Sequence, residues 1–440
     1  MSSKSIFWFR RDLRLIDNHG LFQALTQSKA VFPIFIFDDK ITGALEKNDH
    51  RLLFISKQLE LINLELKKHN SSLTIFKGDP VNIFKKICTN IDIDKVFWNK
   101  DYEPYAIKRD NEIISFLNVK NIKSHVYKDQ VIFEQNEIVK NDGNPYVVYT
   151  PYSKKWIEKL NHNHLKHYRS ESFLNKIKPL ESELKTENAF DSHQSKIVPP
   201  NINFSNKVID NYERDRNIPA LNATSKLGLY LRFGTNSIRS LVKKSNLSKN
   251  KTFLKELVWR EFFMQILWHF PKTKDKCFKS KYEKIQWRNN MDEYNAWCEG
   301  KTGYPIVDAG MRELNKTGFM HNRVRMITTS FLCKHLLIDW RIGEKYFAAK
   351  LFDYEQSSNV GNWQWVAGCG VDASPYFRIF NPTEQQKKFD KEKEYIKKWI
   401  PEYDTDEYPK EIVDHKLARA RCLKTYKKVL ALPIALKKVK

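Results

Sequence analysis

The sequence predicts an N-terminal α/β domain with a doubly wound parallel sheet, followed by a mostly α-helical domain. Short apolar runs alternate with stretches of helical spacing over residues 1–130, which is the pattern of parallel strands joined by crossover helices. From residue 206 to residue 440 the helical spacing dominates, and glycine-containing turns interrupt it. The stretch between them, residues 131–205, is polar and poorly periodic, and we interpret it as an interdomain connector.

Five compact apolar runs are the predicted strands of the first domain. They read SIFWFR, AVFPIFIFD, LTIFKG, KVFWNK and SHVYKD, and helical stretches such as HRLLFISKQLELINLELKKH separate them. Ligands of doubly wound sheets bind beyond the carboxyl ends of the strands. The charged residues at those ends are Arg10, Arg11, Asp38, Asp39, Asp101 and Glu103. This part contains neither G-x-G-x-x-G nor a Walker loop, so the fold by itself identifies no ligand.

The connector carries three close histidines, His162, His164 and His167, which are candidates for a metal site. No carboxylate or cysteine accompanies them at a useful ligand spacing, and we interpret the segment as a solvated linker. The six cysteines of the chain are scattered and form no Cys-x-x-Cys pair. That pattern argues against a zinc or iron–sulfur site and favours a reducing compartment. We therefore expect no bound metal.

The overall charge favours a polyanionic partner without establishing one. The chain has 76 Lys and Arg against 52 Asp and Glu, a formal net charge of +24, and such a field attracts nucleic acid. A Lys-rich proteome from an AT-rich genome would give the same excess. No apolar run reaches membrane-spanning length, and the first residues lack the apolar core of a secretory signal. We expect a cytoplasmic protein that contacts no membrane.

The helical part contains eight of the eleven tryptophans, and its motif KELVWREFF places side chains suited to base recognition on one helix face. Glu256, Trp259, Arg260 and Phe263 are spaced at i, i+3, i+4 and i+7. An indole stacks on a base, a carboxylate accepts from ring N–H groups, and a guanidinium meets phosphate. The alternative is a helix packed by its tryptophan, with an intrahelical Glu–Arg pair.

Two further motifs add polar and aromatic groups. In MHNRVRMITTSF, Asn322 and Met326 are i, i+4 neighbours, and two arginines point to other faces. Such a set suits a heterocycle or a phosphate, or a solvated surface. The stretch NVGNWQW places Trp363 and Trp365 beside a glycine, which lets backbone approach a flat ligand. Paired tryptophans are also common in protein cores.

A hydroxyl-bearing segment precedes a short helical run. In TSKLGLYLRFG, Thr224 and Ser225 can cap the helix that follows them. Hydroxyls and free N–H groups at a helix N-terminus suit a phosphate. A simple capped helix is the alternative.

The order and spacing of these motifs resemble the photolyase/cryptochrome family. The resemblance rests on WFRRDLRLIDN at 8–18, Tyr212, TSKLG at 224–228, ELVWREF at 256–262, GYPIVDAGMRELNKTGFMHNRVRM at 303–326, LLIDW at 336–340, and NWQW and DASPYFRIFNP within 362–382. It covers nearly the whole chain except the connector at about 160–205. It implies an antenna-chromophore domain at 1–130 and a catalytic domain at 206–440 that binds FAD and DNA.

Carried over by position, the resemblance implies three sets of site residues. FAD would contact Tyr212, Thr224, Ser225, Lys226, Leu227, Gly228, Arg260, Arg325, Asp353, Glu355 and Asn359. Of these, Arg325 and Asp353 would form an acid–base pair beside the isoalloxazine, and Asn359 would face its N5. DNA would contact Arg216, Glu256, Trp259, Asn322, Arg323, Met326, Trp365 and Gln385. The catalytic set would be Glu256, Asn322, Asn359, Trp287, Trp340 and Trp363, whose three tryptophans match the chain of indoles that reduces photoexcited flavin.

Within the family, the chain resembles the class I photolyases of cyclobutane pyrimidine dimers. Asn322 and Met326 stand where repairers of the (6-4) photoproduct carry histidines, and signalling cryptochromes often differ at the position of Asn359. The implied reaction is light-driven electron transfer from reduced FAD to a flipped-out dimer, whose ring splits before the electron returns. The alternatives are a non-enzymatic blue-light-sensing cryptochrome and a basic nucleic-acid-binding module without cofactor. The family also implies a monomer.

Two departures from the family's pattern concern ligand contacts. Lys226 stands where arginine is common, which keeps the positive charge. Tyr105 and Ala106 stand where folate-binding members carry Asn-Glu, which argues against a folate antenna. A second chromophore is still expected, and a deazaflavin, a flavin and a folate all stay open. Its candidate contacts are Arg11, Asp38, Asp101 and Glu103.

Overall fold

The computed structural model describes residues 4–46, 49–180 and 197–431. The chain divides into two compact units. The first comprises Met1–Val139, Lys154–Pro199 and Leu227–Glu261, and the second comprises Lys140–Ser153, Pro200–Lys226 and Phe262–Lys440. Residues from the predicted connector therefore contribute to both units.

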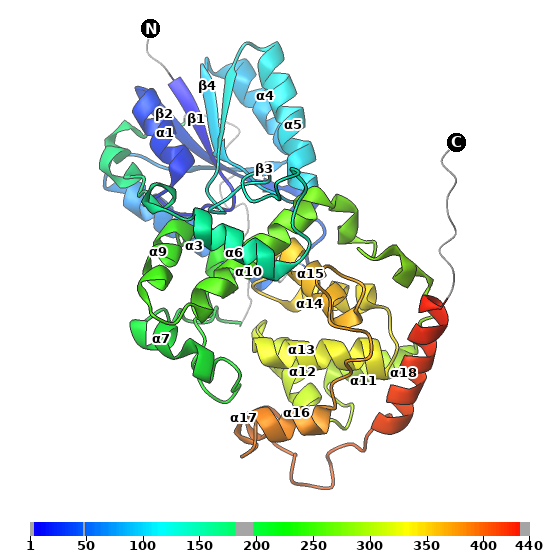
Figure 1. The fold of residues 1–440 in the computed structure, drawn as a ribbon. Helices are drawn as coiled ribbons and strands as arrows, with labels where there is room; N and C mark the ends of the chain where they lie inside the picture. The colour runs from blue at the N-terminus through cyan, green and yellow to red at the C-terminus, as the bar shows by residue number, and fades with distance from the viewer. Residues whose placement is uncertain (1–3, 47–48, 181–196, 432–440) are drawn as a thin grey trace, which may run out of the picture. The chain divides into compact units, whose positions relative to one another are not determined.

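The first unit is built on a parallel sheet of five strands (Figure 1). The strands are β1 (Lys4–Phe9), β2 (Ala30–Asp38), β3 (Thr74–Gly78), β4 (Lys95–Asn99) and β5 (Lys123–Tyr127), in the order β3-β2-β1-β4-β5. Each of the five apolar runs forms one strand, and β1, β2 and β4 are buried along nearly their whole length. The strand order reverses between β1 and β4, which is where doubly wound sheets bind ligands.

Helices cover both faces of this sheet. α1 (His19–Gln27) lies on one face, and α4 (Pro80–Asn90) and α5 (Pro104–Val119) pack together on the other (Figure 1). The unit also contains α2 (Asp39–Thr42), α3 (His50–Lys67), α8 (Gly228–Arg232), α9 (Ile238–Leu247) and the 3₁₀ helices η1 (His162–Leu165) and η2 (Ser170–Lys176). Two helices, α6 (Tyr149–Lys159) and α10 (Thr252–His269), have residues in both units. Trp8 and Trp98 are among the buried residues of the core.

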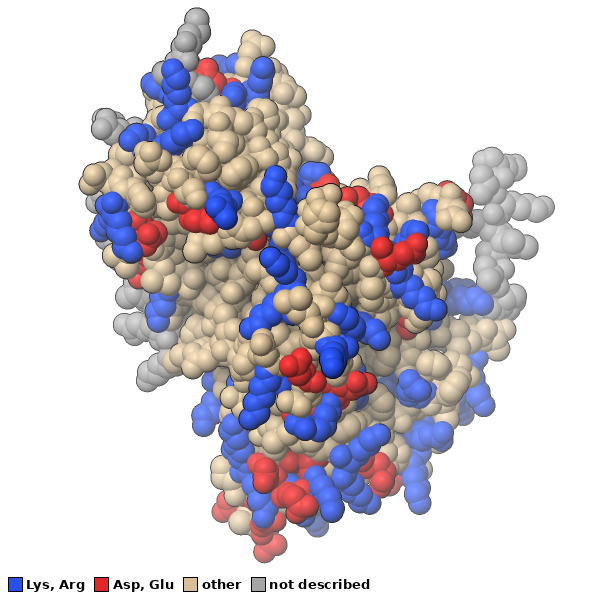
Figure 2. All heavy atoms as spheres, turned by 60° about the vertical axis from the view of Figure 1, so that its left-hand side comes forward, with Lys and Arg blue, Asp and Glu red and all other residues tan. Residues whose placement is uncertain are grey.

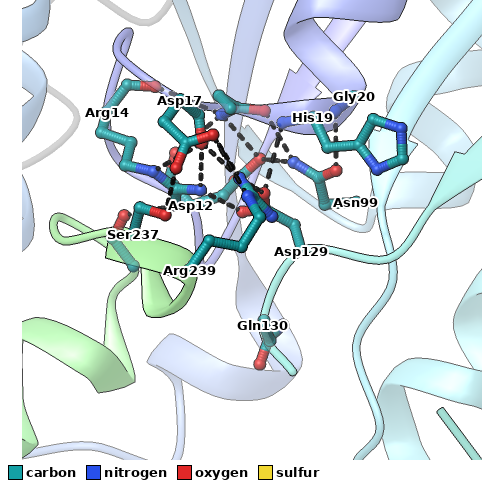
Figure 3. Close-up of polar contacts among 12 residues, drawn as sticks. Asp12, Arg14, Asp17, His19, Gly20, Asn99, Asp129, Gln130, Ser237 and Arg239 are labelled. Carbon is teal, nitrogen blue, oxygen red and sulfur yellow. Dashed lines mark hydrogen bonds and ion pairs between the residues drawn. The ribbon is translucent and has the colours of Figure 1, made fainter. Parts of the chain in front are cut away.

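A buried ionic cluster fixes the loop that follows β1. Arg14 donates to Asp129 at 2.6 Å, and Arg239 donates to Asp17 at 3.0 Å and to Asp129 at 2.9 Å. Figure 3 shows the two guanidinium groups converging on the two carboxylates. All four side chains are at most 8% exposed. Because a buried charge without a partner is strongly destabilising, this cluster holds the WFRRDLRLIDN segment to α9.

The second unit is helical, as the sequence predicts for this part of the chain. It contains α7 (Asn206–Asp215), α11 (Met291–Glu299), α12 (Pro305–Thr317), α13 (Asn322–Ser330), α14 (Trp340–Lys350), α15 (Gln356–Ala367), α16 (Pro382–Phe389), α17 (Glu394–Trp399) and α18 (His415–Leu430). Shorter helical segments are η3 (Pro271–Lys274), η4 (Ser280–Lys284) and the π-helical η5 (Phe331–His335). α12 and α13 approach closely at Gly310, where a Cβ would lie 2.4 Å from Val324.

Other sequence-based expectations concern charge, membranes and metals. Lysine and arginine side chains are spread over the face drawn in Figure 2, and acidic side chains form smaller groups among them. In the described part of the chain, no helix is long and apolar enough to cross a bilayer, and no group of three potential metal-ligating side chains gathers.

Two of the connector histidines interact with residues close to them in sequence. His164 accepts from the Asn161 backbone at 3.2 Å, and His167 lies 3.0 Å from Glu171.

Candidate functional site

The start of α13 presents a polar group of side chains in the second unit. Asn322 is the first residue of the helix and is exposed, and its amide makes no side-chain hydrogen bond within the described ranges. Arg323 Nη1 lies 3.7 Å from the sulfur of Met326. Arg323 also donates to Asn217 at 2.7 Å and stacks 4.5 Å from the ring centre of Phe389. The structure therefore gathers Asn322, Arg323 and Met326 at one helix end.

A second cation, Arg216, lies beside Arg323. It directly follows α7, and its guanidinium lies 5.8 Å from the ring centre of Tyr212 on that helix. Burial lowers the pKa of Arg323, and the charge of Arg216 lowers it further. Because guanidinium groups bind phosphate oxygens through charge-assisted hydrogen bonds, two neighbouring arginines make this end of α13 suited to a phosphate. Gln385 lies half-buried on α16. The same helix carries Phe389, on whose ring Arg323 stacks.

Arg325 and Asp353 form the predicted acid–base pair in the same unit. Arg325 Nη2 donates to Asp353 Oδ2 at 3.0 Å, and Arg325 Nε donates to the Met320 carbonyl at 2.7 Å. The other carboxylate oxygen, Asp353 Oδ1, is buried and accepts no hydrogen bond from any described residue. Leaving such an oxygen unsatisfied is costly. A ligand N–H or O–H would therefore find an acceptor here.

His321 lies next to these groups, and the sequence reasoning missed it. Its Nδ1 accepts from the Arg323 backbone N–H at 3.2 Å, so the neutral ring carries its proton on Nε2. That Nε2 is buried and has no partner in the described part of the chain. Burial and, to a smaller extent, the charges of Arg325 and Arg323 together lower the pKa of His321 to about 4. The only sequence signal was its place directly before Asn322.

The TSK segment does not cap a helix, so that expectation is wrong. α8 begins at Gly228, its N-cap residue is Leu227, and no side chain caps it. The cause is Lys226, whose φ of +55° turns the chain and separates Thr224 and Ser225 from the helix start.

Lys226 nevertheless reaches the cluster around Arg325. Its ammonium lies 5.9 Å from the ring centre of Phe319, and the guanidinium of Arg325 lies 5.5 Å from the same ring. Two cations therefore meet at one aromatic side chain. Leu227 and Gly228, the last two predicted FAD contacts of this segment, belong to the first unit.

Two predicted FAD contacts lie on or beside α15, and their side chains bind the protein. Glu355 is the N-cap and accepts from the backbone of Ser358 at 2.8 Å. Asn359 Nδ2 donates to Glu344 Oε1 at 2.9 Å, while burial raises the pKa of Glu344. This bond orients the Asn359 amide, whose oxygen accepts no hydrogen bond from protein within the described ranges. Asn359 is therefore available to a ligand through its oxygen.

The Trp-x-Trp pair of α15 divides between core and surface. Trp363 is 1% exposed and packs edge-on against Phe347 at 5.1 Å, whereas Trp365 is half-buried. Gly343 leaves room for the buried indole, because a Cβ there would lie 2.3 Å from it. The helical period separates the two faces.

The other two tryptophans of the predicted electron path belong to the same core. Trp340 begins α14 and is 1% exposed, whereas Trp287 is half-buried. The backbone N–H of Arg288 donates to the Leu337 carbonyl at 2.8 Å. This bond ties the chain beside Trp287 to the turn before Trp340.

The predicted base-recognition stripe forms part of α10 in the first unit. Glu256, Trp259 and Arg260 are half-buried, whereas Leu257 and Val258 between them are fully buried. Arg260 Nη1 donates to the Gln130 carbonyl at 2.8 Å. The helix forms as predicted, but Phe263, the fourth residue of the stripe, is buried and belongs to the second unit. Base recognition by this face stays a prediction.

Comparison with known proteins accounts for both units. Residues 5–170 match the family model for DNA photolyase, and residues 253–407 match the FAD binding domain of DNA photolyase. The deoxyribodipyrimidine photo-lyase of Synechococcus sp. is 35% identical, over 95% of this chain and 91% of its own length. This chain belongs to the DNA photolyase family. The deoxyribodipyrimidine photo-lyase of Escherichia coli is 33% identical, over 96% of this chain and 98% of its own.

Solved photolyase structures share the fold of this chain. A class III photolyase from Agrobacterium tumefaciens superposes with a TM-score of 0.87 at 32% identity, over 98% of both chains. An archaeal photolyase from Sulfolobus tokodaii, described with two FAD molecules and a novel light-harvesting cofactor, gives 0.80 at 31% identity, over 97% of this chain and 100% of its own. These comparisons confirm three predictions: the fold class, the assignment as a photolyase enzyme, and FAD as the cofactor.

The second unit of this photolyase fits an FAD. Asp353 Oδ1 is a buried acceptor and His321 Nε2 a buried donor, and both lack partners among the described residues. Lys226 and Arg325 supply positive charge at Phe319. A cofactor with ring N–H and carbonyl groups and a diphosphate would satisfy these atoms.

The residues predicted to contact an antenna chromophore, all in the first unit, form ion pairs and hydrogen bonds within the protein. Arg11 donates to Asp101 and to Glu103 at 3.0 Å each, and Arg232 donates to Glu103 at 2.7 Å. Burial would raise the pKa of Asp101, but Arg11 and nearby cations hold it well below its usual range. The loops after β1 and β4 are thus joined by ion pairs at the reversal point of the sheet.

Asp38, at the end of β2, is satisfied in the same way. It accepts from the Tyr105 hydroxyl at 2.7 Å and from Arg109 at 3.3 Å. Burial and the neighbouring carboxylate raise the pKa of Tyr105. A second chromophore in this unit therefore stays a prediction.

Proposed function

We propose that this photolyase repairs cyclobutane pyrimidine dimers in DNA by light-driven electron transfer. The observation that supports this most directly is the polar end of α13. There Asn322 and Arg323 adjoin Arg325, whose partner Asp353 keeps one oxygen without a donor among the described residues. Groups suited to a base and a phosphate thus lie within one turn of groups suited to the cofactor. The Synechococcus and Escherichia coli relatives are deoxyribodipyrimidine photo-lyases, which agrees with this activity.

Bound FAD would supply the light-driven electron. The residues of the chain would bind the DNA and the FAD and orient them relative to each other. Asn322 would offer its amide to the base edges of the flipped-out dimer, and Met326 an apolar contact. Arg216 and Arg323 would hold the DNA phosphates. Trp259 and Trp365 would stack on the bases, and Glu256 would accept from a ring N–H.

The cofactor side would be held by the second unit's unsatisfied groups. Asp353, paired with Arg325, would accept a hydrogen bond from the ring system, and neutral His321 would donate one. Asn359 would present its oxygen to the flavin, because Glu344 already takes its amide hydrogen. Trp363, Trp340 and Trp287 would form the path by which an external donor returns the cofactor to its reduced state.

We also propose that the enzyme belongs to class I, because it carries Glu256, Trp259 and Asn322. A photolyase from Agrobacterium that shares its fold is of class III, so the class has to be tested. A monomer that acts on DNA in the cytoplasm is part of the same proposal.

Replacement of Asn322 by alanine tests the substrate side. We expect dimer affinity to fall about 10- to 100-fold, the effect of losing a good base contact, with FAD content unchanged. Asn206→Ala is the matched control, because Asn206 is also an exposed first residue of a helix, α7. Binding is measured with an oligonucleotide carrying one thymine dimer, and repair under light on the same sample.

Glu256→Gln serves as the companion variant from α10, and we expect a similar loss. Equal affinity in Asn322→Ala and Asn206→Ala would contradict the assignment of the α13 end. If both variants bound FAD and neither wild type nor variants repaired the dimer, the blue-light-sensing alternative would replace the enzyme.

A further inference from the structure

A lysine-rich segment leads to the half-buried indole of Trp287. Residues 271–284, PKTKDKCFKSKYEK, contain six lysines, Lys272, Lys274, Lys276, Lys279, Lys281 and Lys284, and all six are exposed. Cys277 and Tyr282 of the same stretch, and Ile285 directly after it, are buried in the core of the second unit. These anchors hold the segment in place while its lysines face solvent. We call the six lysines the basic surface.

The charge of the basic surface is poorly neutralised. None of its lysines forms an ion pair with another residue in the described part of the chain. Of the two acids in the segment, Glu283 is already held by Arg341 through two contacts of 2.7 and 2.8 Å. Asp275 alone is left to face six ammonium groups. The segment therefore carries an excess of positive charge that an anionic partner could neutralise.

The basic surface and Trp287 meet at α18. Tyr282 and Trp287 pack edge-on against the same side chain, Tyr426, with ring centres 6.0 and 6.3 Å away. α18 adds further exposed cations, among them Lys424 and Lys427. The segment that carries the basic surface and the half-buried indole of Trp287 are thus packed on one side chain of α18.

Trp287 is the one tryptophan of the proposed path that reaches solvent, because Trp340 and Trp363 are each 1% exposed. An electron that refills this path must therefore enter at Trp287. A donor has to bring its redox centre close to the indole edge, and the positive charge of the basic surface would steer an acidic donor toward this side of the unit. Complexes between electron-transfer partners of this kind have small interfaces and are short-lived.

The chemistry of the basic surface favours a protein over DNA. All six cations are lysines, whereas arginine is the residue that grips phosphates with a planar fork. Arginines occur instead at the end of α13, as Arg216 and Arg323. DNA, moreover, brings no electron to an indole.

We propose that the basic surface docks a small acidic protein with a one-electron redox centre, which re-reduces Trp287. One electron passes from the reduced carrier to the oxidised indole, and the carrier is oxidised by one electron. An indole that has lost its proton regains one from solvent at Nε1. The proposal rests on the electron path through Trp363, Trp340 and Trp287.

The test uses the FAD-loaded full chain and an acidic two-iron ferredoxin. Binding of oxidised ferredoxin is measured in the dark, and decay of the tryptophan radical after a flash is followed with reduced ferredoxin or with ascorbate. We expect Lys281→Glu/Lys284→Glu to weaken ferredoxin binding about tenfold or more and to remove its acceleration of the decay, with the ascorbate reaction unchanged. Lys85→Glu/Lys86→Glu on α4, also exposed, is the matched control.

Equal ferredoxin binding by the two double variants would overturn the proposal. So would weakened binding of undamaged duplex DNA, with ferredoxin binding intact, in Lys281→Glu/Lys284→Glu. Trp287→Phe separates the docking from the path: we expect the long-lived radical signal to vanish and ferredoxin binding to persist. A persisting signal in that variant would contradict the electron path itself.

Discussion

In the first unit, Arg14 and Arg239 share the buried carboxylate of Asp129. Arg239 also binds the carboxylate of Asp17, so every one of these charges has a partner. In the second unit, Arg325 engages only one oxygen of Asp353, and the other oxygen is left buried without a donor in the described part of the chain. Both regions combine arginine with aspartate at low exposure. They differ in whether the protein itself completes the hydrogen bonding.

That difference separates a structural cluster from a binding site. Charged side chains at strand ends, such as Arg11 and Asp101, match the place where doubly wound sheets bind ligands, yet they pair with each other. Around α13 the protein leaves an acceptor on Asp353 and a donor on His321. A buried acceptor and a buried donor without partners, both close to Arg325, are therefore the sign of a ligand in the second unit.

The largest expected effect is loss of stability on breaking the first cluster. Asp129→Ala would leave Arg14 without its carboxylate and Arg239 with only Asp17, and we expect the free energy of unfolding to fall by about 3–5 kcal/mol. FAD affinity should be unchanged. Urea denaturation measures the loss, and the exposed Asp92→Ala is the control, with a change within about 0.5 kcal/mol. Similar values for the two variants would mean that the cluster is not structural.

Asp353→Asn should have the opposite pattern. The substitution keeps the shape of the side chain but removes its charge, and we expect FAD to bind about 10- to 100-fold more weakly, a cost of about 1.4–2.8 kcal/mol. The stability of the FAD-free protein should change by less than about 1 kcal/mol, because the variant still offers an oxygen to Arg325. FAD titration by fluorescence checks this, with the exposed Asp406→Asn as control. Lost stability with unchanged affinity would contradict the assigned role.

The smallest effect concerns the pH dependence of stability. The folded pKa of His321, about 4, lies below its ordinary value of 6.5, so between these pH values the unfolded chain binds a proton that the folded chain does not. The stability that His321 contributes is complete above pH 6.5 and falls as the pH drops toward 4. We expect wild type to lose about 2 kcal/mol more than His321→Gln between pH 7.5 and 4.5.

His162→Gln, a change at an exposed histidine, is the control for this measurement and should follow the wild type. Identical pH profiles for wild type and His321→Gln would remove His321 from the site.

The sequence predicted the parts of the molecule that depend on local pattern. The five apolar runs became strands because alternating strands and helices leave few other arrangements, and the spacing of Glu256, Trp259 and Arg260 gave one helix face. The TSK cap was wrong, because the left-handed turn at Lys226 depends on a φ value that the residue type does not announce.

Long-range pairing escaped the sequence altogether. Arg232 binds Glu103 across 129 residues, and Arg239 binds Asp17 across 222. No spacing rule indicates which charges at the strand ends meet such partners. His321 was missed for the same reason: its significance comes from Lys226 and Arg325, which the fold brings near it.

We propose that this photolyase uses bound FAD and light to split a pyrimidine dimer in DNA. The most direct test is to load the full chain with FAD, add a reductant and an oligonucleotide with one thymine dimer, and compare illuminated with dark samples. We expect the two thymines to be restored in the illuminated sample and not in the dark sample. Bound FAD with a dimer that survives illumination would contradict it.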